Sequence, residues 1–393
     1  MNYENNNWNK IRKIIMSIGG LKGLVTLGMA DIIAGGIIAI FWFYMATLLG
    51  TEDYGKISYF LAIGSMASTI SLIGGNNMLY VYPAKNIKIE SPVFFISLVT
   101  GCVSSIVLFF IFHDVGTSIY SLGSMIFTLA SSEILGKKLY NSYAKYLITQ
   151  KVLMTTLGIG FFYLSGWEGV IIGIALSFFP HIIRIYRGFK DSKLDFSLIK
   201  TRFGFMIHSY FLNFASALSG SIDKIIIAPI LGYALLGNYQ LGLQFISIFQ
   251  LFPAIVYKYT LPHDASGNPN IILKKWVILI SIISTTLLIS LAHLVIPYLF
   301  PKYTEVTDVI QIASLSLIPG AIVIIYHSKF LGTEKSKYMI YGAIISIVVQ
   351  IISIIILGTY YGLEGIAASL VLAGTSDMIF CIIVDQRSKE KKV

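Results

Sequence analysis

Long apolar blocks, separated by short polar or glycine-containing loops, follow one another along the whole chain. A transmembrane helix needs about 20 mostly apolar residues to cross the hydrocarbon core of a bilayer. The pattern predicts twelve such helices, near Val25–Leu49, Ile57–Tyr80, Pro92–Phe112, Thr117–Leu135, Leu147–Leu164, Val170–Tyr186, Phe205–Leu231, Asn238–Tyr257, Trp276–Val295, Val309–Tyr326, Tyr338–Leu357 and Ile366–Val384. We therefore expect an all-α polytopic membrane protein.

The basic residues are distributed unevenly between alternate loops. Most of the 29 lysine and arginine residues fall in the terminal segments and in loops on the same side as them, including the linker RGFKDSKLDFSLIKTRF after the sixth helix. The opposite loops carry acids, such as Glu52, Asp53 and Glu168. Because cytoplasmic loops are enriched in Lys and Arg, this pattern predicts that both termini are cytoplasmic. We expect a multi-pass protein of the cytoplasmic (inner) membrane.

Two short motifs occur once in each half of the chain. LGTEDYG at Leu49–Gly55 is similar to LGYALLG at Leu231–Gly237, and GWEGVIIGIALS from Gly166 is similar to GLEGIAASLVLA from Gly362. The offsets are similar and span six helices, so the two repeats share the same orientation. We expect two six-helix lobes, residues 1–200 and 201–393, related by a pseudo-two-fold axis along the membrane normal, with a binding site between them near the midplane.

Composition excludes several other classes of protein. With 56% hydrophobic and 12% charged residues, the chain has too few charges for a soluble globule, in which about 25% are charged. The net charge of +10 fits cytoplasmic loops better than nucleic-acid binding, since no soluble basic face is predicted. Cys102 and Cys381 lie in apolar runs, and the six histidines are not at close metal-ligand spacing. We expect no metal, no cofactor and no catalytic site, so the chain is not predicted to be an enzyme.

Charged residues within the predicted spans are the candidate functional groups. An ionised side chain at the bilayer centre costs about 2.5–3.5 kcal/mol on insertion scales, so it usually faces a cavity or a partner. Asp223 and Lys224 are adjacent, and a helix turns about 100° per residue, which predicts that Asp223 is a poor partner for Lys224. The alternatives for Lys224 are contact with a substrate or pairing with Asp31 of the first span. Asp31 could carry a proton, as could Asp377, or Asp31 could make a polar contact on a Gly28/Asp31/Gly35 helix face.

Several segments resemble the polysaccharide transporter family, which includes O-antigen and exopolysaccharide flippases, within the multidrug/oligosaccharidyl-lipid/polysaccharide exporter superfamily. The segments are LGTEDYGKISYFLAIGSMAS, SIDKIIIAPILGYALLGNYQLG, LFPKYTEVTDVIQIASLSLIPGAI and YYGLEGIAASLVLAG. The resemblance implies a two-lobed transporter that flips polyprenyl-diphosphate-linked oligosaccharide by alternating access. It also implies association with membrane lipids and with a polysaccharide polymerase and glycosyltransferases.

In that setting Lys224, with Asp223 beside it, is the candidate contact for the diphosphate. Four further residues near the cytoplasmic ends of spans could form a basic vestibule for the diphosphate, or could simply belong to the positively charged cytoplasmic rim: Arg184, His208, His327 and Lys329. Glu133, also near a cytoplasmic end, is expected to be solvated. The alternative function is an ion-coupled multidrug extruder of the same superfamily. The absence of any charge from the span Asn238–Tyr257 favours the flippase, because many extruders carry acids there.

Overall fold

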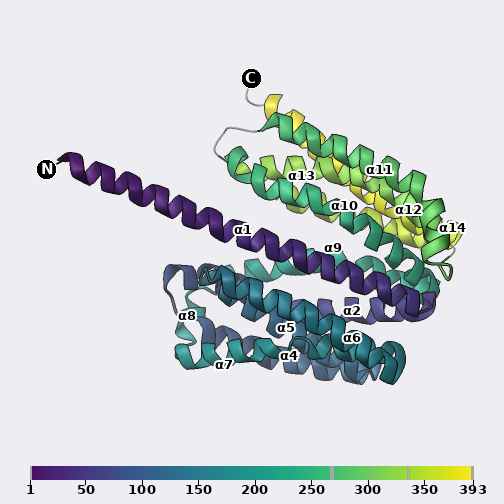
Figure 1. The fold of residues 1–393 in the computed structure, drawn as a ribbon, viewed down its shortest axis with the longest axis horizontal. Helices are drawn as coiled ribbons and strands as arrows, with labels where there is room; N and C mark the ends of the chain where they lie inside the picture. The colour runs from purple at the N-terminus through teal and green to yellow at the C-terminus, as the bar shows by residue number, and fades with distance from the viewer. Residues whose placement is uncertain (1, 266–269, 304, 334, 336, 391–393) are drawn as a thin grey trace. The chain divides into compact units, whose positions relative to one another are not determined.

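All regular structure in the described part of the chain is helical (Figure 1). The computed structural model describes residues 2–265, 270–303, 305–333, 335 and 337–390. The helices are α1 Asn2–Leu48, α2 Thr51–Ser71, α3 Gly75–Val81, α4 Glu90–Phe112, α5 Val115–Gly136, α6 Tyr140–Leu176, α7 Ile182–Asp191, α8 Ser197–Lys200, α9 Phe203–Leu231, α10 Tyr233–Ala265, α11 Ile271–Leu299, α12 Val306–Ala313, α13 Leu317–Gly332 and α14 Lys337–Glu390. Short 3₁₀ turns at Pro83–Lys85, Phe179–His181 and Ser314–Ser316 connect some of them.

The helices account for the twelve predicted spans. Nine apolar segments of the described residues are long enough to cross a membrane, and the bent pair α2 and α3 supplies one more. Two of the nine, Tyr140–Asp191 and Lys337–Arg387, contain 52 and 51 residues, about twice the length that one crossing needs. Each of these two therefore contains two spans, and the total is twelve. The prediction of an all-α polytopic membrane protein is confirmed.

Glycine produces the turn within each of the two longest segments. Gly166 in α6 and Gly362 in α14 have closely similar backbone angles, φ 64° and ψ −142° against φ 57° and ψ −130°. Glycine adopts positive φ without steric strain, so the chain can reverse at these points. The helical segment after each turn packs tightly on the segment before it. A Cβ on Gly169 would lie 2.7 Å from the carbonyl carbon of Phe161, and a Cβ on Gly365 would lie 3.0 Å from the backbone nitrogen of Gly358. The repeated Gly-x-Glu-Gly motif thus builds the same helical hairpin twice.

The helices form two compact units. The first contains residues 1–41 and 64–214, and the second contains residues 42–63 and 215–393. In the first unit α5 packs against α4 and α6. In the second unit α13 packs against α10, α11 and α14 (Figure 1). The lobe boundary at residues 200 and 201 remains a prediction.

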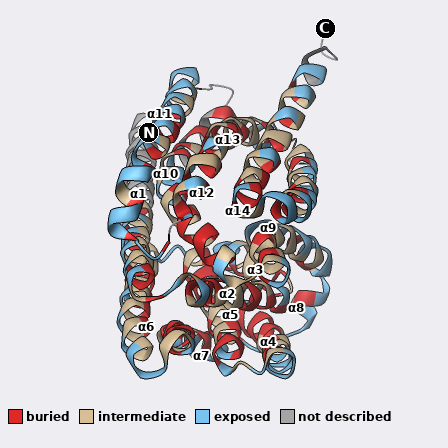
Figure 2. Ribbon diagram, turned by 90° about the vertical axis from the view of Figure 1, so that its right-hand side faces the viewer, coloured by how far each residue is buried: buried red, intermediate tan, exposed pale blue. Residues whose placement is uncertain are grey.

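Small residues allow the central helix of the first unit to be enclosed by its neighbours. In the apolar 18-residue stretch of α5, 56% of the residues are buried, against 28% in the corresponding stretch of α4. Figure 2 shows the buried residues gathered along α5. Ser118, Ser121, Gly123 and Ser132 are among the buried positions of this helix. In a bilayer, helices associate through close packing of small residues, because lipid is as apolar as leucine. Large side chains at the periphery, such as Phe110 and Leu164, are correspondingly exposed.

The first repeated motif forms a close helix crossing within the second unit. The start of α2 meets the start of α10, and a Cβ on Gly55 would lie only 2.9 Å from the backbone nitrogen of Gly237. The reciprocal contact is similar, since a Cβ on Gly237 would lie 3.1 Å from the nitrogen of Gly55. The two copies of the motif therefore pack on each other, and the last glycine of each one makes the backbone approach possible.

Two lysines on the predicted outward side have local partners in this same unit. The Nζ atom of Lys302 donates to the carbonyl oxygens of Thr47 and Leu48 at 3.3 and 3.1 Å, at the end of α1. Lys56 pairs with Glu52 at 2.8 Å, one turn away on α2. A cation at a helix C-terminus is stabilised by the last carbonyl groups and by the helix dipole. These contacts explain two exceptions to the charge asymmetry of the loops.

Candidate functional site

Asp223 and Lys224 form an ion pair on α9. The Nζ atom of Lys224 lies 3.2 Å from Oδ1 of Asp223 and 3.2 Å from the carbonyl oxygen of Gly220. The prediction that the neighbouring carboxylate would be a poor partner is therefore wrong, because the long lysine side chain folds back along the helix. Tyr239 of α10 donates its hydroxyl to Oδ2 of Asp223 at 3.0 Å, and the Asp223 side chain is only 6% exposed. The positive charge of Lys224 is thus balanced within the second unit.

Arg184 lies in a buried network of charges in the first unit. Its guanidinium donates from Nη2 and Nε to Oε2 of Glu133, at 2.5 and 3.1 Å. Lys137 bridges Oε1 of Glu133 at 2.6 Å and Oε1 of Glu90 at 3.0 Å. Both carboxylates are almost fully buried, with 2% of the Glu133 side chain and 3% of the Glu90 side chain exposed. The expectation that Glu133 is solvated is wrong, because it is the centre of this network.

The interactions of Lys137 with the two carboxylates favour its charged form. Partial burial by itself lowers the pKa of Lys137, but its hydrogen bonds and charge interactions with Glu133 and Glu90 outweigh burial and raise the pKa. The network contains two acids and two bases, so it is neutral overall. Arg184, a candidate for the vestibule, therefore has its charge balanced by a carboxylate.

Asp31 lies on α1, in the first unit. Tyr143 of α6 donates its hydroxyl to Oδ1 of Asp31 at 3.4 Å, and α1 packs through Ala30 and Ala34 against Leu147. The pairing of Asp31 with Lys224 remains a prediction, as does a role for Asp31 in proton coupling.

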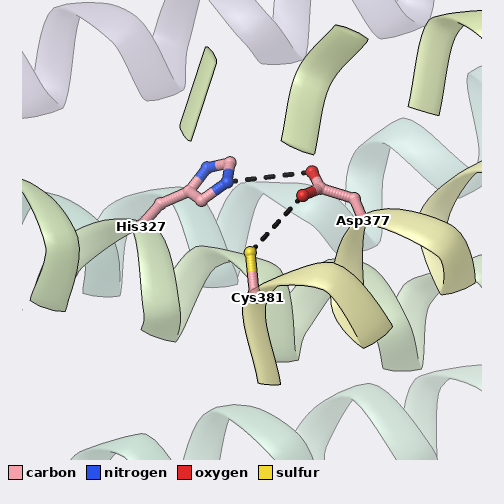
Figure 3. Close-up of side chains that lie close together, drawn as sticks. All are labelled: His327, Asp377 and Cys381. Carbon is pink, nitrogen blue, oxygen red and sulfur yellow. Dashed lines mark hydrogen bonds and ion pairs between the residues drawn. The ribbon is translucent and has the colours of Figure 1, made fainter. Parts of the chain in front are cut away.

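The other vestibule candidates have different surroundings. His208 is exposed on α9. Lys329 on α13 pairs with the buried carboxylate of Asp385 on α14. His327, two residues earlier, lies with its Nε2 atom 3.7 Å from Oδ2 of Asp377. Asp377 also accepts a hydrogen bond from the Cys381 thiol, so the three residues come together as Figure 3 shows.

The structure identifies one further intramembrane cation, Lys151, which the sequence analysis did not develop. At about 1.5 Å of rise per residue, Lys151 lies about 17 Å from the start of α6 at Tyr140 and about 21 Å from the turn at Ser165. It is therefore close to the midplane. Its position inside the apolar run LITQKVLMTT was a signal in the sequence.

Lys151 has aromatic neighbours and, within the described part of the chain, no acidic partner. Its Nζ atom lies 5.6 Å from the centre of the Phe127 ring. The Phe127 ring in turn packs edge-on against His181, with ring centres 5.0 Å apart, and the Nε2 atom of His181 is buried without a hydrogen bond in the described structure. Among the described residues, no carboxylate pairs with Lys151, in contrast to Lys224, Arg184 and Lys329.

The fold is that of known membrane transporters. The sequence matches no protein-family model and no curated protein. A solved structure of the lipid II flippase MurJ in an inward closed conformation is similar with a TM-score of 0.76 and 16% identity, covering 92% of this chain and 87% of that chain. An outward-facing multidrug resistance MATE family transporter of the MOP superfamily is similar with a TM-score of 0.66 and 14% identity, covering 95% and 97%. An inward-facing MATE transporter gives 0.65 and 14%, covering 93% and 96%. The chain therefore has the twelve-helix fold that the MurJ flippase shares with the MATE transporters.

Proposed function

We propose that this protein is a flippase that moves polyprenyl-diphosphate-linked oligosaccharide across the cytoplasmic membrane by alternating access. Residues 1–200 would rock against residues 201–393, and the lipid tail would stay in the bilayer while the diphosphate and sugars cross. A polysaccharide polymerase and glycosyltransferases would act on the same lipid-linked intermediate. The similarity of the fold to a lipid II flippase supports a lipid-linked substrate.

The observation that carries the proposal is the position of Lys151, close to the midplane and without a carboxylate partner among the described residues. An ionised lysine near the midplane is costly unless it meets water, a carboxylate or an anionic ligand. Asp223 and Glu133 pair with cations, Asp31 accepts from the Tyr143 hydroxyl, and Asp377 lies beside His327. Lys151, in contrast, has no carboxylate partner among the described residues. A lysine at this depth without such a partner favours an anionic substrate such as a diphosphate. A carrier of cationic drugs would instead need a surplus acid.

This charge balance changes the order of the candidate contacts. Lys224 remains a candidate for the diphosphate, but its ammonium must first leave Asp223. Arg184 and Lys329 must likewise leave Glu133 and Asp385. Lys151 needs no such exchange, and a lysine ammonium is a suitable point charge for phosphate. We therefore place Lys151 first among the residues that contact the diphosphate.

The test is flipping in reconstituted liposomes. A polyprenyl-diphosphate disaccharide with a fluorescent label on the sugar would be followed by quenching from outside the vesicle, for the wild type, Lys151→Met, Lys151→Arg and Lys224→Ala. A charged hydrogen bond contributes about 1.5–3 kcal/mol, so Lys151→Met should slow flipping about tenfold or more, whereas Lys151→Arg keeps the charge and most of the activity. The exposed Lys193→Met on the basic linker is the control and should behave as the wild type.

The outcomes separate the parts of the proposal. Unchanged flipping by Lys151→Met would refute the role of Lys151 while leaving the flippase in place. No flipping of any glycan-lipid, together with export of a cationic dye, would replace the flippase by the multidrug extruder.

A further inference from the structure

His327, Asp377 and Cys381 bring three different metal-ligating atoms together in the second unit (Figure 3). His327 lies on α13, and Asp377 and Cys381 lie one turn apart on α14. The imidazole nitrogen, the carboxylate oxygen and the thiol sulfur lie within 4.8 Å of one another. The sequence separates His327 from the other two by a whole span, so ligand spacing along the chain does not reveal the group.

The distances fit a small tetrahedral ion. With Zn–N near 2.0–2.1 Å, Zn–O near 2.0–2.2 Å and Zn–S near 2.3 Å, a tetrahedral site separates its nitrogen and oxygen ligands by about 3.3 Å and its sulfur and oxygen ligands by about 3.5 Å. Here Nε2 of His327 lies 3.7 Å from Oδ2 of Asp377, and Sγ of Cys381 lies 3.4 Å from Oδ1 of the same carboxylate. Shifts of a few tenths of an ångström and a turn of the carboxylate would bring all three atoms onto one ion.

The imidazole of His327 lacks a satisfying partner. Its Nε2 atom is buried and makes no hydrogen bond in the described structure, and 3.7 Å is too long for one to Asp377. Buried polar atoms of native proteins nearly always make a hydrogen bond, so a buried nitrogen that makes none and faces a carboxylate indicates a bound ligand. A cation between the two groups would satisfy both.

Gly342 leaves room for the Asp377 carboxylate, and the three side chains lie near the C-terminal ends of α13 and α14. Gly342 lies against Asp377, and a Cβ there would lie 3.2 Å from Cγ of Asp377, so a larger residue would displace it. His327 lies about 8 Å along the helix from the end of α13 at Gly332, and Cys381 about 9 Å from Arg387. The His327 side chain is 20% exposed, whereas Cys381 is fully buried. The group thus lies one to two turns inside the predicted cytoplasmic face.

The types of ligand select the class of metal. Thiolate and imidazole ligands suit transition metals better than hard cations such as Na⁺, and Mg²⁺ and Ca²⁺ prefer oxygen ligands alone. One nitrogen, one oxygen and one sulfur suit Zn²⁺, and three protein ligands leave a fourth position open to water or to another ligand. We propose that His327, Asp377 and Cys381 form a zinc-type transition-metal site that links α13 to α14. This inference does not depend on the proposed transport function.

The site can be tested by metal titration of the purified full-length protein. After treatment with a chelator, Zn²⁺ binding would be measured by competition with a fluorescent zinc indicator, in the presence of excess Mg²⁺. We expect one saturable site per chain that Mg²⁺ does not displace. Since loss of an outer-shell partner alone costs about 10–100-fold in metal affinity, Cys381→Ser and His327→Gln, which each remove a ligand, should weaken binding about tenfold or more. Because the chain has only two cysteines, Cys102→Ser is a matched control and should bind as the wild type.

Cobalt supplies a second measurement that reports the ligands directly. Co²⁺ in the same site should show a sulfur-to-metal charge-transfer band that Cys381→Ser abolishes and Cys102→Ser retains. Each variant would first be checked for an unchanged melting temperature in the absence of metal, and His327→Gln replaces Cys381→Ser if the latter fails to fold. Absence of a saturable site in the wild type would overturn the proposal. Binding or a charge-transfer band that both Cys381→Ser and His327→Gln leave intact would also overturn it.

Discussion

The substitution Glu133→Gln tests the buried charge network of the first unit. The Glu133 carboxylate accepts hydrogen bonds from the Arg184 guanidinium and the Lys137 ammonium, and the Glu133 side chain is 2% exposed. An amide of the same shape removes one negative charge and leaves two cations with the single carboxylate of Glu90. Removing one partner of a buried ion pair costs about 3–5 kcal/mol, because the other charge is left uncompensated.

The exposure of the two cations lowers this estimate. Arg184 is 13% exposed and Lys137 is 27% exposed, so water can reach part of each, and the glutamine oxygen can still accept one hydrogen bond. We expect a loss of about 2–3 kcal/mol in the free energy of unfolding. For a cooperative unit of about 200 residues, about 2–4 °C of melting temperature corresponds to 1 kcal/mol, so the melting temperature should fall by about 4–12 °C.

The assay is thermal unfolding of the purified protein in detergent, followed by intrinsic fluorescence. Glu168→Gln is the control, because Glu168 belongs to the same unit but is exposed, and it should melt as the wild type does. In the double variant Glu133→Gln/Arg184→Gln the stranded guanidinium is gone, so its loss of stability should be smaller than the sum of the two single losses. A Glu133→Gln variant that melts within a degree of the wild type would refute the argument, and so would simple additivity in the double variant.

Two further substitutions test how the helices are packed and capped. Gly55→Ala should destabilise the second unit by about 1–3 kcal/mol, because the added Cβ would meet the backbone of Gly237. Gly50→Ala is the control, since a Cβ there meets nothing within 4 Å. Equal melting temperatures for the two variants would contradict the close crossing of α2 and α10. Asp114 accepts hydrogen bonds from two backbone amides at the start of α5. Asp114→Ala should therefore lower the free energy of unfolding by about 0.5–2 kcal/mol, whereas Asp114→Asn retains the helix cap. Identical melting temperatures for the two variants would contradict the capping role.

The number and type of the helices could be predicted from the sequence because the bilayer imposes a length and a polarity on each span. The apolar blocks predicted twelve spans, and the two repeated motifs predicted two related six-helix lobes. Gly166 and Gly362 confirm this, since both adopt positive φ in the same helical hairpin. Two boundaries differ, because α1 begins well before the apolar run and the span Ile57–Tyr80 bends by 62° between α2 and α3. Gly74 permits that bend with φ 75°.

The partners of the charged residues could not be predicted in the same way. A sequence gives the direction of a side chain from its helix but not the path of a long flexible one, so the pairing of Lys224 with its neighbour Asp223 was predicted wrongly. Glu133 was expected in water because the sequence does not show that Arg184 and Lys137 converge on it. The same limit hid the meeting of His327 on α13 with Asp377 and Cys381 on α14.

The sequence by itself thus determined that this chain is a twelve-span, all-helical membrane protein built from two related halves, because hydrophobic length and glycine position act locally. Only the tertiary structure decided which buried charges are balanced. Electrostatic pairing depends on distances of a few ångströms between helices far apart in the chain, and in a medium of low dielectric those distances decide how strongly two charges interact. Glu133 meets two cations in this way, whereas no carboxylate of the described residues pairs with Lys151.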